Sequence, residues 1–401
     1  MWLSGLKLVQ KCGKGGWLMP ALADYVRANQ NRAFTEMPLN VLDIAAINEL
    51  AYLTFDQAFA HQIFGQTSFT LAELTCLEQG QEHTSFYDRW FTKGRLEIFY
   101  AMQAAPRFAD LRLSHYCNHI DADLERQFGA MLFSLPQLEH FQLVFRGTDD
   151  SVIGWKEDLK LTYLTELPAH RLAIAYLQHY LVSAQEPFMV TGHSKGGNLA
   201  LYALCALQPQ QTALISAVYL FDAPGLPKPA LQASSYRLLR PKLRIFRPEL
   251  SIVGTVLYCD VRPTIVKSNA FGIFQHKTAS WQVDLRGQFL TSQAAAPFSQ
   301  RMELALKEWM LTLSHQEFKL VIDSLFDSLL ANDIKSLRSF GYNRKTLRQL
   351  YQILASLSSM NMTKKRVLWK SLRCLLKAYR HIWRKDQLLA LRAQLAFLTK
   401  W

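Results

Sequence analysis

Residues 187–205 have the sequence PFMVTGHSKGGNLALYALC, which carries the strongest pattern in the chain. The short apolar run at 188–190 is typical of a buried strand. Gly192, Gly196 and Gly197 interrupt it, and the Leu- and Ala-rich segment after them predicts a helix. Ser194 would therefore sit on a tight strand-to-helix turn, where glycines on either side let the two elements approach closely.

The spacing of this turn matches G-x-S-x-G, the pattern in which an α/β-hydrolase presents a serine nucleophile above the edge of its sheet. Ser194 is therefore the expected nucleophile. The alternative is an ordinary strand–loop–helix junction with no chemistry.

The rest of the chain predicts a sheet flanked by helices. Strand patterns occur at residues 97–100, 111–117, 130–134, 141–145, 217–221, 243–246, 255–258, 264–267 and 280–283. Helical patterns occur at 40–59, 169–182, 198–207 and from 300 onward. Strands and helices alternate after residue 147, as they do in parallel sheets. The earlier strands are separated only by turns and are expected to be antiparallel. The fold class expected is α/β, with a mixed, mostly parallel sheet.

Charge divides the chain in two. The net charge is +13, but residues 331–401 hold 16 Lys and Arg against 2 Asp and Glu. That segment carries +14 and residues 1–330 carry −1. We expect an α/β domain at 1–330 with an N-terminal helical extension, and a basic all-helical C-terminal segment at 331–401.

Several classes of protein are disfavoured by the sequence. It has no apolar run long enough to span a membrane and no signal-peptide pattern at its start, which predicts a cytoplasmic protein. Its six cysteines lack C-x-x-C spacing, which favours reduced thiols over disulfides or a zinc site. No Walker A, dinucleotide-binding or HExxH pattern occurs, so we expect neither cofactor nor metal.

The general base should be a histidine that follows the nucleophile in the chain. Only His276, His315 and His381 lie beyond Ser194. His276 falls in a loop after a strand pattern, while the other two lie in helical segments, so His276 is the expected base. A solvent-exposed loop histidine is the alternative.

The acid that orients this base is less clearly marked. Asp222 directly follows the strand pattern at 217–221, and carboxylates at the carboxyl ends of strands face the ligand-binding edge of a sheet. Asp222 is therefore favoured, although Asp-x-Pro-Gly is also good turn chemistry. Glu249 and Asp260 remain open.

The oxyanion hole needs two backbone donors. The N–H of Lys195, the residue after the serine, is one, and the N–H of Thr148, after the strand at 141–145, is the other candidate. Trp155 and Asp158 are expected to brace the loop behind Thr148. His193 is expected to pack, and the Lys195 side chain to be solvated.

The segments VFRGTD (144–149), GWKEDL (154–159) and GHSKGGNLA (192–200) resemble the lipase class 3 branch of α/β-hydrolases. With FTEMPLN (34–40) and FDAPG (221–225), the chain is more closely similar to the Mbeg-like family of bacterial proteins within that branch. The resemblance covers roughly residues 30–290. It implies a serine hydrolase with Ser194 as nucleophile, His276 as base, and Thr148 with Lys195 as the oxyanion hole.

One departure concerns the acid. Class 3 lipases carry it in a D-x-V-P-type loop, and the matching loop here is ELSIVG (249–254), with Ser251 where the aspartate would be. The resemblance therefore implies that Asp222 or Glu249 has taken the role, or that the triad is incomplete.

The sequence thus predicts a hydrolase of a carboxylic ester, either a small molecule or a lipid, acting through an acyl-enzyme on Ser194. Residues 332–401 combine an apolar helical stripe with basic clusters, which favours peripheral contact with the anionic inner face of a membrane. The rival hypothesis is a non-catalytic hydrolase-fold module that binds membrane or, less favoured, nucleic acid through these helices. A helical tail docked on the body with its basic face in water is a further alternative.

Overall fold

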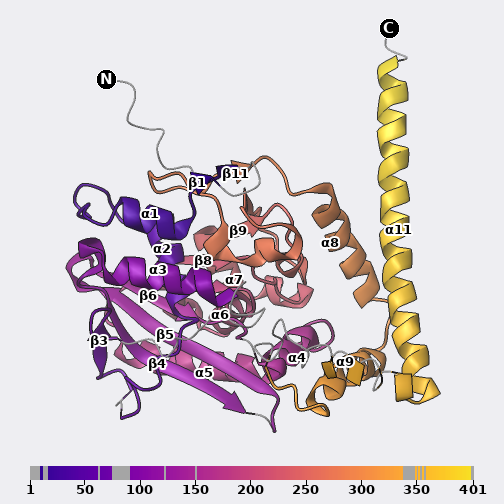
Figure 1. Cartoon of the computed structure of the whole chain (residues 1–401), viewed down its shortest axis with the longest axis horizontal. Helices are drawn as coiled ribbons and strands as arrows, with labels where there is room; N and C mark the ends of the chain where they lie inside the picture. The colour runs from indigo at the N-terminus through magenta and orange to yellow at the C-terminus, as the bar shows by residue number, and fades with distance from the viewer. Residues whose placement is uncertain are drawn as a thin grey trace.

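Nine strands form one mixed sheet in the order β11-β10-β9-β8-β7-β6-β5-β4-β3 in a computed structural model of the chain (Figure 1). The structure describes residues 10–11, 17–61, 64–74, 91–121, 123–149, 151–336, 348–349, 351–352, 355 and 358–398. The strands of the sheet are β3 (Ser68–Thr70), β4 (Arg112–Asp121), β5 (Arg126–Leu135), β6 (His140–Phe145), β7 (Phe188–His193), β8 (Ile215–Phe221), β9 (Leu243–Pro248), β10 (Thr264–Val266) and β11 (Thr291–Ser292). A separate pair joins β1 (Gln10–Lys11) to β2 (Trp17–Leu18).

The sheet is not mostly parallel, and that expectation was wrong. Strands β6 to β10 make four parallel pairings, while β3 to β6 and β10 with β11 make four antiparallel ones. The reason lies in the connections. Short turns join β4 to β5 and β5 to β6, whereas helices connect the strands from β6 to β9, and only a longer crossover permits parallel pairing.

Helices cover both faces of the sheet (Figure 1). Their bounds are α1 (Leu22–Ala28), α2 (Val41–Leu50), α3 (Lys93–Gln103), α4 (Val152–Lys160), α5 (Pro168–Ser183), α6 (Lys195–Cys205) and α7 (Ser234–Leu239). Side chains of β5 alternate between two cores. Met131 and Phe133 pack with α1, α2 and α3, while Ala130 and Leu132 pack with α5 and α6. This alternation follows from the two-residue period of a strand.

Three predicted strands are absent from the described structure. Residues 97–100 lie in α3, where Leu96, Phe99 and Met102 are buried at helical spacing. A short apolar run does not distinguish a buried strand from a buried helix, so the prediction was wrong. Residues 255–258 and 280–283 make only isolated bridges, at Tyr258, Trp281 and Val283.

The described residues from 297 onward are mostly helical, as expected, but residues 331–336 form a turn and an isolated bridge at Ser336 instead of a helix. The helices are α8 (Pro297–Met310), α9 (His315–Leu330) and α11 (Met362–Leu398). At about 1.5 Å per residue, α11 is about 55 Å long. It lies along α8 and reaches beyond the body (Figure 1). Among the described helices, none has the length and apolar composition that a membrane span requires. Residues 337–347 and 399–401 of the tail lie outside the described residues, and the division at residue 330 stays a prediction.

Candidate active site

The carboxyl end of β7 carries a strained turn at Ser194. Its backbone has φ 58° and ψ −136°, a combination that side-chain-bearing residues rarely adopt and that costs roughly 1–3 kcal/mol. The turn is fixed because the Ser194 N–H donates to the Phe221 carbonyl of β8 and α6 begins at Lys195. Such strain persists only where the surrounding structure imposes it.

Gly192 and Gly196 make this turn possible. A Cβ on Gly192 would lie 2.5 Å from the backbone of Gly196, and one on Gly196 would lie 2.1 Å from the Phe145 carbonyl oxygen. Both distances are far below a normal contact. The glycines flanking Ser194 are therefore required by the close packing of β6, β7 and α6, which confirms the packing that the sequence predicted for them.

Asp222 and His276 meet at the same edge of the sheet. Asp222 follows the last residue of β8, and its Oδ2 lies 2.7 Å from Nδ1 of His276. Asp222 is 1% exposed, and His276 ends the short 3-10 helix Gly272–His276. The His276 ring packs against the ring of His193, the residue before the serine, with ring centroids 4.5 Å apart and ring planes tilted by 32°. The structure therefore brings the predicted base and acid together beside the Ser194 turn.

The second oxygen of Asp222 accepts hydrogen bonds from the loop at residues 249–254, in which Ser251 stands where an acid was expected. This oxygen, Oδ1, accepts a hydrogen bond of 2.5 Å from the Ser251 hydroxyl and one of 3.2 Å from the Gly254 N–H. Ser251 therefore supports the carboxylate rather than leaving a gap. The two other acids bond elsewhere: Glu249 accepts from Ser292, and Asp260 accepts from Tyr236 and Arg240.

The loop after β6 lies directly against the Ser194 turn. A Cβ on Gly147 would come within 2.6 Å of the His193 carbonyl oxygen and 3.1 Å of the Ser194 Cβ. The Thr148 hydroxyl donates to Asp158 at 2.6 Å, and the Trp155 indole N–H donates to the Asp149 carbonyl at 3.1 Å. Asp158 and Trp155 thus brace the loop, as predicted.

The N–H of Lys195 belongs to the first residue of α6, and the first N–H groups of a helix have no acceptor within it. With Thr148 on the neighbouring loop, this end of the helix provides the setting for two donors beside the serine. Anions are also favoured there by the helix dipole.

The Lys195 side chain is not solvated, and that expectation was wrong. It is 1% exposed, and its Nζ donates to Glu157 at 2.9 Å and to the Gln127 carbonyl at 3.2 Å. Burial lowers the pKa of Lys195, but the adjacent charges of Glu157 and Asp158 outweigh it and raise the pKa above its usual value. Burial also affects Asp158, and it raises the pKa of that carboxyl to about 6. The Lys195 side chain therefore links the start of α6 to Glu157 in α4 and does not extend into solvent.

The His193 side chain packs against the His276 ring, as predicted, and it also forms a hydrogen bond with the His276 backbone. Its Nε2 lies 2.8 Å from the His276 carbonyl oxygen, which can only accept, so Nε2 carries the proton. Its Nδ1 then accepts from the Tyr52 hydroxyl at 2.7 Å. Burial, followed by the charges of His276 and Arg95, holds the pKa of His193 well below its usual value. A neutral His193 therefore fixes the backbone at His276.

Sequence reasoning missed Tyr52, Ser251 and Gln275 as parts of this arrangement. Gln275 accepts from the Leu250 N–H at 2.8 Å through its side chain, and its carbonyl accepts from the Trp281 indole at 2.7 Å. The contact of Gln275 with Leu250 joins two segments 25 residues apart, and no local pattern marks it. Only the position of Ser251 in the expected acid loop gave a signal.

No group of His, Cys, Asp and Glu side chains within the described residues could hold a metal ion. Cys117, Cys205, Cys259 and Cys374 are free thiols, and Cys12 and Cys76 lie outside the described residues.

A model of the Mbeg1-like family matches residues 102–327. That range contains Ser194, His276, Asp222, Thr148 and Lys195 but not Tyr52. No curated protein matches the chain.

Proposed function

The chain belongs to the Mbeg1-like family, and from that premise we propose that it is a serine hydrolase of carboxylic esters. We also propose that its sheet is an α/β-hydrolase sheet related to lipase class 3. The parallel strands β6 to β9 and the G-x-S-x-G turn after β7 support that assignment.

In the first half of the reaction, Ser194 Oγ attacks the ester carbonyl carbon while His276 Nε2 takes the hydroxyl proton. His276 then gives that proton to the departing alcohol, which leaves an acyl group on Ser194. In the second half a water molecule, deprotonated by His276, attacks the acyl carbon. His276 then returns this proton to Ser194 Oγ as the bond between that oxygen and the acyl carbon breaks, which releases the carboxylic acid and restores the resting enzyme. Asp222 holds the imidazole in the tautomer that presents Nε2 to the serine.

The negative charge that develops on the carbonyl oxygen needs fixed donors. The N–H groups of Thr148 and Lys195 are proposed for this role. The bracing of Thr148 by Asp158 and of Lys195 by Glu157 supports it, because donors that are already oriented need no reorganisation during the reaction.

The observation that carries the proposal is the 2.7 Å pair of Asp222 and His276 beside the strained Ser194. Within the described residues, neither the Ser194 hydroxyl nor His276 Nε2 has a hydrogen-bond partner, so both stay available for each other and for substrate. Contacts of this kind often tighten only when substrate binds.

We expect the acyl group of the substrate to be apolar. Phe271 and Ile273, in the turn that ends at His276, are 87% and 62% exposed. Exposed apolar side chains beside a reactive group favour a lipid or other hydrophobic ester over a polar one.

A fluorophosphonate probe should label the wild-type protein, because the probe reacts with an activated serine. The Ser194→Ala variant should show no labelling on the same gel. Ser216→Ala is the matched control, since it removes an exposed serine hydroxyl at the amino end of β8, opposite the end that carries Asp222, and its labelling should equal that of wild type. An unlabelled wild type, or equal labelling of the Ser194 variant, would refute the proposal and favour a non-catalytic module.

Ser251→Ala should lower kcat against a p-nitrophenyl ester by about 10- to 100-fold, because Asp222 loses a charge-assisted hydrogen bond worth about 1.5–3 kcal/mol. Ser251→Thr, which keeps a hydroxyl, should recover part of the loss. Unchanged turnover in Ser251→Ala would show that Ser251 does not support the acid.

A further inference from the structure

The helix α11 presents a face that the rest of the molecule leaves uncovered. Its 37 residues carry ten Lys and Arg and a single Asp. The helix stands at the margin of the body and extends past it (Figure 1).

The opposite face of α11 is fixed to α8 and α9. Ala378 is 2% exposed and Ser371 is 5% exposed, so small residues sit against the body. Arg301 of α8 bonds to Asp386 at 3.0 Å, and Lys370 bonds to Glu317 of α9 at 2.6 Å. These contacts determine which side of α11 faces outward.

One stripe of the outward face is basic. Arg373, Lys377, Arg380 and Arg384 follow one another at helical spacing, and all are exposed. None of the four has an ion-pair partner within the described residues. Together with Leu376 and His381 they line a shallow surface hollow of about 600 Å³. This stripe offers concentrated, uncompensated positive charge.

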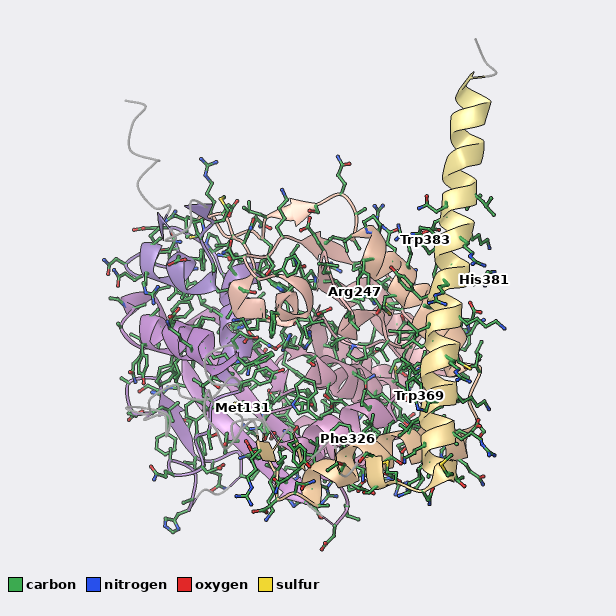
Figure 2. The ribbon with its side chains drawn as sticks, turned by 45° about the vertical axis from the view of Figure 1, so that its right-hand side comes forward. Met131, Arg247, Phe326, Trp369, His381 and Trp383 are labelled. Carbon is green, nitrogen blue, oxygen red and sulfur yellow. The ribbon has the colours of Figure 1, made fainter. Side chains whose placement is uncertain are left out.

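The adjoining stripe is apolar and aromatic. Trp369, Leu372, Leu376 and Trp383 are 60%, 45%, 46% and 45% exposed. Figure 2 places Trp369 and Trp383 on one side of α11 and His381 on the other. Trp369 and Leu372 also line an apolar groove of about 610 Å³ between α11 and α9, together with Phe318 and Leu368. The stripe therefore continues into a groove that apolar chains could enter.

We propose that this outward face of α11 binds the surface of a bilayer that contains anionic lipid. Arg and Lys would meet the headgroups, while the tryptophans and leucines would enter the boundary with the acyl chains, where aromatic side chains are favoured. Charge alone would suit nucleic acid equally well. The exposed leucines and the groove favour the bilayer, because a nucleic-acid backbone would leave them in water.

Flotation of the full chain with vesicles tests the proposal. Vesicles of phosphatidylcholine with about one third phosphatidylglycerol should bind the wild type, and pure phosphatidylcholine vesicles should bind it far less, because anionic headgroups attract basic side chains at the surface. Raising the salt to about 0.5 M should weaken binding, since screening shortens the reach of these charges. Ser194→Ala should bind like wild type, so the result does not depend on the proposed chemistry.

Three variants locate the contact. A charge variant changes the four basic residues of the stripe to glutamine: Arg373→Gln, Lys377→Gln, Arg380→Gln and Arg384→Gln. Because each such charge contributes about a factor of five near an anionic surface, binding of the charge variant should fall by about 600-fold. An aromatic variant, Trp369→Ser with Trp383→Ser, should lose roughly tenfold or more. The control removes the same charge from other exposed sites: Lys228→Gln, Arg237→Gln, Arg262→Gln and Lys267→Gln.

The control variant should bind like wild type. Equal weakening of the control would show that net charge, rather than α11, drives binding. Full binding by the aromatic variant would likewise contradict the proposal. The proposal would also be contradicted if the wild type did not bind anionic vesicles but retarded a DNA duplex in a gel.

Discussion

Asp222→Asn is expected to lower kcat by about 10⁴ and to leave the protein folded. The reason is specific to this site. Ser251 and Gly254 both donate to Oδ1, so the amide oxygen of an asparagine would take that position. Its NH₂ group would then face His276 Nδ1, which must become an acceptor. The imidazole would carry its proton on Nε2 and could not take one from Ser194.

Turnover of a p-nitrophenyl ester measures this effect, and circular dichroism checks the fold. Glu249→Gln and Asp260→Asn are the matched controls, because each removes one carboxylate that bonds elsewhere. Both should keep turnover within about tenfold of wild type. If Asp222→Asn kept a tenth of the activity, or if Glu249→Gln lost as much, the assignment of the acid would be wrong.

The centre of the fold and most of the site could be predicted because local chemistry marks them. The turn at Ser194 needs glycines on both sides, and the need is visible as G-x-S-x-G. Asp222 was favoured because it directly follows a predicted strand and so lies at the carboxyl edge of the sheet, where ligands bind. His276 followed from chain order together with its place in a loop after a strand pattern, since His315 and His381 lie in helical segments. Each of these signals depends on neighbouring residues or on topology, which a sequence displays.

What could not be predicted depends on contacts between distant segments. Ser251 counted against a complete triad, because the sequence shows a missing aspartate but not the hydroxyl bonded to Asp222. Tyr52 reaches His193 across 141 positions. The burial of Lys195 depends on Glu157, a partner on another helix. The helix at residues 93–103 was missed because its apolar run also suits a strand.

Lys195→Met should reduce the free energy of unfolding by about 3–5 kcal/mol, because it leaves the charge of Glu157 buried without its partner. Glu157 is 0% exposed and, among the residues that the structure describes, would keep the N–H groups of Gln127 and Ala169 as its only donors. Urea unfolding followed by circular dichroism measures the loss. Lys228→Met, which removes an exposed lysine, should change stability by less than about 0.5 kcal/mol.

Two further measurements separate the side chain of Lys195 from its backbone. Adding Glu157→Gln to Lys195→Met should recover part of the stability, since a neutral amide is less costly to bury than an unpaired carboxylate. Turnover of the folded Lys195→Met protein should stay within about tenfold of wild type, because residue 195 keeps the N–H proposed for the oxyanion hole. A loss of about a thousandfold in a fully folded variant would instead place the ammonium group itself in the reaction.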